Sequence, residues 1–289
     1  MSKISQRGLR ITAAAAGAGV IAAAALAATA HAGPADAATS APQRATLVTT
    51  RVQLSPMPQG TVAFGRDSKG DVDVTVNVSG LTADSSHAVE LVNGSGRVIT
   101  TFSRLTADSV GQARDETLRS GYKGTLGSWR VVVRNGMAGD RVSAEPIART
   151  SNYNSGQHTY QLISVEASSG GKSYGTPKGS VVIAYDQAKQ TISVTVNASG
   201  FTPGRHAAHI HVGSCVSQGP VQFMLKDFTA NADGRIVNET RVVTHVTAPL
   251  AAAGWYLNLH QGNSNNILAN GNPTINFRPL LCGDITTQG

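Results

Sequence analysis

The residues with the clearest potential for chemistry are three histidines in the second half of the chain. His209 and His211 stand two apart in the run Ala-Ala-His-Ile-His-Val-Gly, and His260 ends the run Tyr-Leu-Asn-Leu-His. Side chains two apart on a strand point to the same face, so the first two histidines are predicted to project together. Neutral imidazoles bind copper and zinc. Three of them predict a metal site, provided that the two strands are neighbours, with a fourth position open to water, substrate or another side chain.

Strands are the elements that must position these histidines. Residues 71–78 and 191–196 alternate polar and β-branched side chains, which predicts half-buried strands. Turn-forming runs such as Asp233-Gly234 separate the strand-like segments. No long helical pattern follows residue 32. The sequence therefore predicts an all-β fold, an antiparallel sandwich or flattened barrel.

An internal repeat organises the chain after its first segment. The run Val-Thr-Val-Asn-x-Ser-Gly-x-Thr begins at Val74 and again at Val194. We therefore expect two β-domains, residues 45–150 and 157–289, joined by a polar linker. The first-domain positions that match the three histidines are Glu90, Val92 and Arg134. The first domain is accordingly predicted to be a degenerate copy without a metal site, with a structural or partner-binding role.

Residues 1–32 are predicted to be a cleaved secretory signal. A basic start precedes an Ala-rich apolar run, and Ala30-His31-Ala32 provides a small-x-small cleavage pattern. A membrane anchor is the alternative for this segment. Residues 33–44 read as an unstructured linker, and no later run reaches the roughly 20 apolar residues of a membrane helix. The mature protein is expected to be secreted, with no membrane partner.

Composition argues against nucleic acid as a partner. Loss of residues 1–32 removes three basic and no acidic residues, which lowers the formal net charge from +7 to about +4. The chain has no run of Lys and Arg and few aromatic side chains for stacking on bases. A weakly positive surface suits attraction of a small anion, whose identity the charge does not specify.

The chain has two cysteines, Cys215 and Cys282. In an exported protein an even number predicts one disulfide. A pair of thiolate metal ligands is the alternative, which the lack of a C-x-x-C spacing disfavours.

The histidine segments resemble those of copper-zinc superoxide dismutases. The resemblance rests on a common order of short motifs: His209-Ile-His211, Gly213, Cys215, Gly219-Pro220, Leu257-Asn-Leu-His260 and Cys282-Gly283. The same segments are at least as similar to chordin-type repeat (CHRD) domains, through the Ala-Ala-His-Ile-His-Val-Gly run, Gly-Pro-Val and Tyr-x-Asn-x-His. The likeness covers most of residues 170–289 and implies an immunoglobulin-like Greek-key sandwich in each repeat.

The dismutase resemblance implies copper at His209, His211 and His260. Val221 stands where that family has the histidine that bridges copper to zinc, and the zinc loop is missing, so zinc is not expected. Arg278 resembles the arginine that guides superoxide, offset by one residue, with a surface arginine as the alternative. Cys215 and Cys282 match the family's disulfide.

His206 could act as an extra ligand. It begins the strand that carries His209, so its ring could turn toward the metal position. Its match to His87 in the repeat favours a turn or packing role instead.

The sequence is compatible with three functions. The first, which is the main prediction, is a secreted superoxide dismutase-like protein with a three-histidine copper site at which superoxide could be dismutated. The second is a non-catalytic secreted binding or matrix module of the CHRD type, with protein partners that the sequence does not identify. The third is a copper-binding protein without turnover. The missing bridging histidine favours the second and third, whereas the cysteine pair and His260 favour the first and third.

Overall fold

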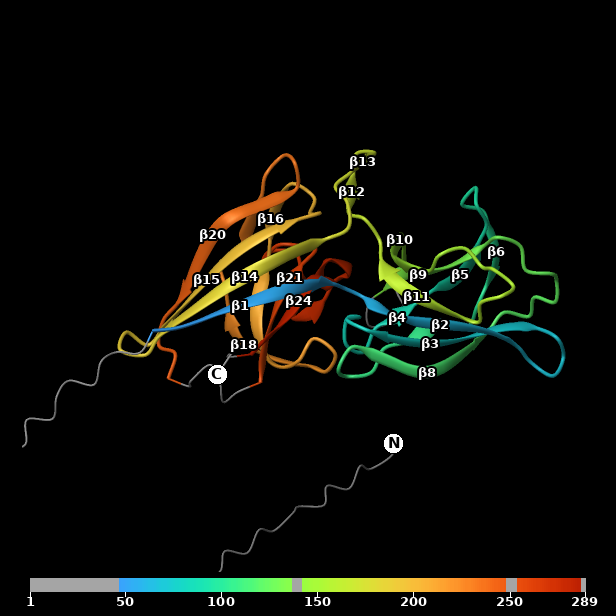
Figure 1. Cartoon of the computed structure of the whole chain (residues 1–289), viewed down its shortest axis with the longest axis horizontal. Helices are drawn as coiled ribbons and strands as arrows, with labels where there is room; N and C mark the ends of the chain where they lie inside the picture. The colour runs from blue at the N-terminus through green and yellow to red at the C-terminus, as the bar shows by residue number, and fades with distance from the viewer. Residues whose placement is uncertain (1–46, 137–141, 248–253, 287–289) are drawn as a thin grey trace, which may run out of the picture. The chain divides into compact units, whose positions relative to one another are not determined.

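The computed structural model describes residues 47–136, 142–247 and 254–286, and nearly all of their regular structure is β-strand (Figure 1). The predicted signal and linker lie outside these residues. The chain from Arg44 to Gly289 forms one compact unit. Within the described ranges no helix is long and apolar enough to span a bilayer. The all-β prediction is confirmed, and the arrangement is consistent with β-sandwich packing.

Two antiparallel eight-stranded sheets make up most of the fold, and we call them sheet I and sheet II. Sheet I has the order β6 (Val98–Thr101), β5 (Val89–Val92), β9 (Arg130–Gly136), β10 (Val142–Arg149), β11 (Thr159–Ser164), β2 (Gln59–Arg66), β3 (Val72–Ser79) and β8 (Gln112–Arg119). Sheet II has the order β18 (Gln218–Met224), β17 (Ala208–Gly213), β21 (Trp255–His260), β24 (Pro279–Ile285), β1 (Leu47–Pro56), β14 (Lys178–Asp186), β15 (Thr191–Ser199) and β20 (Arg235–Val243).

Short pairs of strands complete the described structure. They are β4 (Ser86–His87) with β7 (Leu105–Thr106), β12 (Ser168–Ser169) with β13 (Lys172–Ser173), β16 (Gly204–His206) with β19 (Phe228–Ala230), and β22 (Leu268–Ala269) with β23 (Asn272–Pro273). A 3₁₀ turn, η2 (Ile275–Phe277), precedes β24. The side chain of Thr274 caps this turn by accepting a hydrogen bond from the Asn276 amide.

Each sheet has its own apolar core. In β3 and β15 buried residues alternate with partly exposed ones, as the sequence pattern predicts. The apolar side chains of β3, among them Val74 and Val76, pack in the core of sheet I, and those of β15, among them Val194 and Val196, pack in the core of sheet II. Burial of these side chains is the main force that fixes the register, since a shift by one residue would turn them to the other face.

The first strand of each half lies in the sheet of the other half. Strand β1 pairs with β14 from Leu47↔Asp186 to Leu54↔Gly179 and also contacts β24 (Figure 1, blue strand). Strand β11 pairs with β2 and β10 in sheet I. Both strands thus hydrogen-bond across the expected boundaries of residues 45–150 and 157–289.

The connection between β1 and β2 holds this crossing in place. Only Met57 and Pro58 separate the two strands, so the chain passes directly from sheet II to sheet I. The Met57 amide donates to the carbonyl of Leu280 at 3.0 Å, and its carbonyl accepts from the Ser164 hydroxyl at 2.9 Å. Gly283 of β24 allows β1 to pack closely against it, because a Cβ at this position would lie 2.7 Å from side-chain atoms of Val52 and Leu54.

A disulfide links Cys215 to Cys282, with an S–S distance of 2.04 Å. The prediction of a disulfide is confirmed, and the alternative of two thiolate ligands is wrong because both sulfur atoms are bonded to each other. The bridge ties the loop after β17 to β24 and packs against Met57 and Tyr256.

The exchange of β1 and β11 predicts which sheet is affected by a substitution in each strand. Leu54→Ala and Leu162→Ala each remove a buried side chain and should each lower the free energy of unfolding by about 3 kcal/mol. In amide NMR spectra, Leu54→Ala should shift resonances of sheet II, and Leu162→Ala those of sheet I. The reverse pattern would contradict the strand exchange.

Reduction of the disulfide should destabilise the protein. The bridge joins residues 67 apart in sequence, and closing a loop of that size stabilises the fold by about 4 kcal/mol in the chain-entropy description. A Cys215→Ser, Cys282→Ser double variant should show the same loss in urea unfolding, and further reductant should not change it. An unchanged unfolding midpoint in the double variant would be inconsistent with this role.

Candidate metal centre

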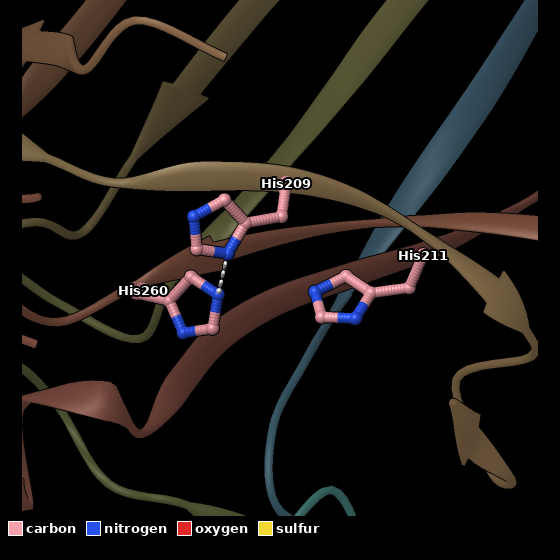
Figure 2. A group of neighbouring side chains, drawn as sticks. All are labelled: His209, His211 and His260. Atoms are coloured by element: carbon pink, nitrogen blue, oxygen red, sulfur yellow. Dashed lines mark hydrogen bonds between the residues drawn. The ribbon is translucent and has the colours of Figure 1, made fainter. Parts of the chain in front are cut away.

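Strands β17 and β21 bring the three histidines together. Ala208 and Ile210 of β17 face the core, so His209 and His211 share the opposite face of the sheet. Strand β17 pairs with β21, where His209 lies opposite Asn258, and His260 stands two residues further along. The strands are neighbours, as the predicted site requires, and one ring nitrogen from each histidine lies within 4.8 Å of the others (Figure 2).

Backbone carbonyls fix two of the three rings. His211 Nδ1 donates to the carbonyl of Gly219 at 2.9 Å, and His260 Nδ1 donates to the carbonyl of Phe277. A carbonyl can only accept, so these Nδ1 atoms carry the protons. The Nε2 atom of each ring is left with a lone pair. Carbonyls that orient ligand histidines in this way are the usual outer partners of metal sites.

His209 turns Nδ1 toward the other two rings. This atom lies 3.1 Å from His260 Nε2, as the dashed line in Figure 2 shows. With typical metal–nitrogen distances of about 2.0 Å, an ion bound to both atoms would have a ligand–metal–ligand angle of roughly 100°. The spacing of the two nitrogens therefore suits two ligands of one ion.

Two ring nitrogens in the cluster lack a hydrogen-bond partner among the described residues. His209 Nε2 and His211 Nε2 are both buried. A buried polar atom without a partner costs about 1–3 kcal/mol, so such atoms are rare unless they serve a purpose. A metal ion would satisfy His211 Nε2 directly, and in this respect the residues fit a metal.

Burial keeps the rings neutral. It lowers the pKa of His260 to about 3 and that of His209 to about 4, and it also lowers the pKa of His211. The neighbouring histidines lower the pKa values of His209 and His260 further, while the carboxylate of Asp227 opposes the shift at His209. Metal binding requires neutral imidazoles, and these three rings are neutral at neutral pH.

The cluster is closed to solvent. His260 is 0 % exposed, His209 3 % and His211 4 %. Catalytic metal sites keep a position open for water or substrate, whereas structural sites do not. The burial of all three rings is typical of a structural metal site.

Tyr256 and two carbonyl groups belong to the site although the sequence assigned them no role. The Tyr256 ring stacks on His211, with 4.9 Å between centroids and 18° between planes. Its hydroxyl accepts from the Gly219 amide at 3.2 Å, so it holds the segment whose carbonyl orients His211. Tyr256 occurs in the Tyr-x-Asn-x-His motif, four residues before His260. The period of two along a strand places both side chains on the same face, and this spacing could have predicted that Tyr256 belongs to the site.

His206 does not join the cluster. Its Nδ1 lies 3.0 Å from the carbonyl of His260 and its Nε2 lies 2.8 Å from that of Thr202. The ring also packs edge-on against Phe201. Both nitrogens are engaged with backbone oxygens, which supports β16 beside the end of β21.

Arg278 lies beneath the surface beside the cluster and does not face solvent. It is 4 % exposed, and its guanidinium lies 3.7 Å from Glu145 and 3.5 Å from the side chain of Gln261. Burial lowers its pKa to about 10, and the charge of Glu145 opposes this shift. Its link to the site is through the backbone, because the preceding residue, Phe277, supplies the carbonyl that orients His260.

Comparison with known families gives one match. Residues 160–266 match the CHRD domain, a range that contains all three histidines. No curated protein matches the chain.

Stability of the metal-free protein should fall as the pH is lowered from 6.5 toward 3. Unfolded histidine protonates near pH 6.5, whereas folded His260 does so near pH 3 and His209 near pH 4. Between these values the unfolded chain binds more protons, so acid favours unfolding. Urea midpoints at pH 7 and pH 4.5, measured after chelation, test this. His260→Asn should lose less stability over the interval, and a loss equal to that of the wild type would contradict it.

Proposed function

We propose that this chain is an exported, non-catalytic binding or matrix module that holds one copper ion through His209, His211 and His260. The observation that carries the proposal is the convergence of three buried, neutral imidazoles, among which His211 turns an unpartnered Nε2 atom toward the other two rings (Figure 2). Imidazole is a favoured ligand of copper. The match of residues 160–266 to the CHRD domain supports the choice of a module over an enzyme.

The environment of the three rings supports retention of the ion over turnover. Carbonyls of Gly219 and Phe277 hold two of the rings in ligand orientation before any ion arrives. The low exposure of the rings leaves little room for a substrate at the fourth position. The disulfide suits an oxidising compartment, in keeping with export.

The proposal includes a finer description of the fold as two repeated immunoglobulin-like Greek-key units. It is supported by the succession of strands in the two sheets, since segments that resemble each other in sequence occupy corresponding places. On this description β1 and β11 are corresponding strands that have changed places. Sheet I is then the copy without the histidines.

Superoxide dismutation is the second candidate, on the strength of the sequence resemblance alone. It would require superoxide to reach the position between three rings that are at most 4 % exposed. The position of the family's bridging histidine is Val221, which pairs with His211 at the edge strand β18 and is 43 % exposed. A valine there can neither bridge two metals nor deliver a proton.

Copper content tests the site. The purified mature protein should bind about one copper per chain, and His209→Ala or His260→Ala should abolish binding because two imidazoles hold the ion too weakly. His158→Ala, at an exposed position outside the cluster, is the matched control and should retain full content. Equal copper in all four proteins would refute the site. A cytochrome-reduction assay on the copper-loaded protein separates the candidates, and rapid superoxide removal would favour the dismutase.

A further inference from the structure

Sheet I carries a cavity at the place that corresponds to the histidine cluster of sheet II. Its volume is about 370 Å³, and its lining includes Val92 of β5 together with Arg130, Val132 and Arg134 of β9. Val92 lies opposite Arg130, just as His211 lies opposite Tyr256 in sheet II. The strand pairs β5·β9 and β17·β21 therefore have the same register, and the cavity occupies the same face.

Three of the four charged side chains that line the cavity are cationic. Arg130, Arg134 and Arg149 line the cavity, and Glu166 is the one acidic residue in its lining. Arg134 forms an ion pair with Glu90 at 2.7 Å. These two residues occupy the positions in sheet I that correspond to His260 and His209 in sheet II. The carboxylate of Glu166 accepts a hydrogen bond from Ser173. The three arginines, set against the carboxylates of Glu90 and Glu166, leave the cavity with a net charge of +1.

Arg130 and Arg149 form no ion pair with any residue in the described ranges. The Nε atom of Arg130 is buried and has no hydrogen-bond partner there. A buried N–H group without an acceptor is costly, and a guanidinium is built to bind two oxygens of one carboxylate, sulfate or phosphate group. Arg130 Nε thus lacks an acceptor that a ligand can supply.

We infer that this cavity of sheet I is a binding site for a small organic anion that carries a carboxylate, sulfate or phosphate group. Arg130 and Arg149 bind the oxyanion, while Arg134, paired with Glu90, forms part of the cavity wall beside them. Val92, Val132 and Pro146 provide an apolar wall for the body of the ligand. The volume suits a body of about the size of one sugar ring or amino acid.

Isothermal titration of the full mature chain tests the inference, with inorganic sulfate, inorganic phosphate and glucuronate as separate probes at constant ionic strength. At least one probe should bind saturably. Arg130→Gln and Arg149→Gln should each weaken it about tenfold, the effect of losing one charge-assisted contact. The three probes show which oxyanion is preferred, and glucose in place of glucuronate should not bind.

Two controls separate this site from other causes. Arg104→Gln removes an exposed arginine outside the cavity and should leave the affinity unchanged. His260→Ala should also leave it unchanged, because the anion site does not use the histidines. Absence of saturable binding for all three probes, or equal affinity in Arg130→Gln and Arg104→Gln, would overturn the inference. Matching thermal midpoints for the arginine variants would exclude unfolding as the cause of a loss.

Discussion

The antiparallel pairing of β17 with β21 is the interaction on which the candidate metal centre depends. One residue of slippage would send His209 and His211 into the apolar core and bring Ala208 and Ile210 out. The pairing is held by the burial of the alternate residues, by the neighbouring strand β24 and by the disulfide beside it. The histidines themselves contribute little to that stability, because their ring nitrogens are in part unsatisfied in the metal-free state. The apolar packing of the strands thus holds three buried polar rings in place.

The exchange of β1 and β11 connects the two sheets more closely than a linker would. Each sheet lacks a central strand unless the other half of the sequence supplies it. Leu54 belongs to the core of sheet II and Leu162 to that of sheet I, so neither core is completed by one half of the chain. Met57, hydrogen-bonded to a residue of each sheet, lies at the crossing. Sheet II, which carries the candidate metal centre, therefore contains strands from both halves.

Comparison of the two sheets shows how one framework can carry different chemistry. Strand pairs with the same register present three imidazoles in sheet II and an arginine-rich face in sheet I. The inward side chains remain apolar in both, since the cores require it. The outward side chains are free to differ because they do not determine the register. In sheet II the three histidine rings on this face are buried, whereas in sheet I the corresponding face lines a cavity.

The sequence by itself determined the strand class, the common face of His209 and His211, and the disulfide. These follow from local rules, since a period of two dictates which side chains share a face and two cysteines leave one pairing. Only the tertiary structure decided that His260 lies beside the other two rings, that Phe277 and Gly219 orient them, and that Arg278 is buried against Glu145. It also decided the exchange of β1 and β11. The sequence places each of these strands with its own repeat, because the matching positions in the two sheets accept the same alternation of side chains. The crossing depends on the two-residue connection between β1 and β2, which carries the chain from sheet II to sheet I.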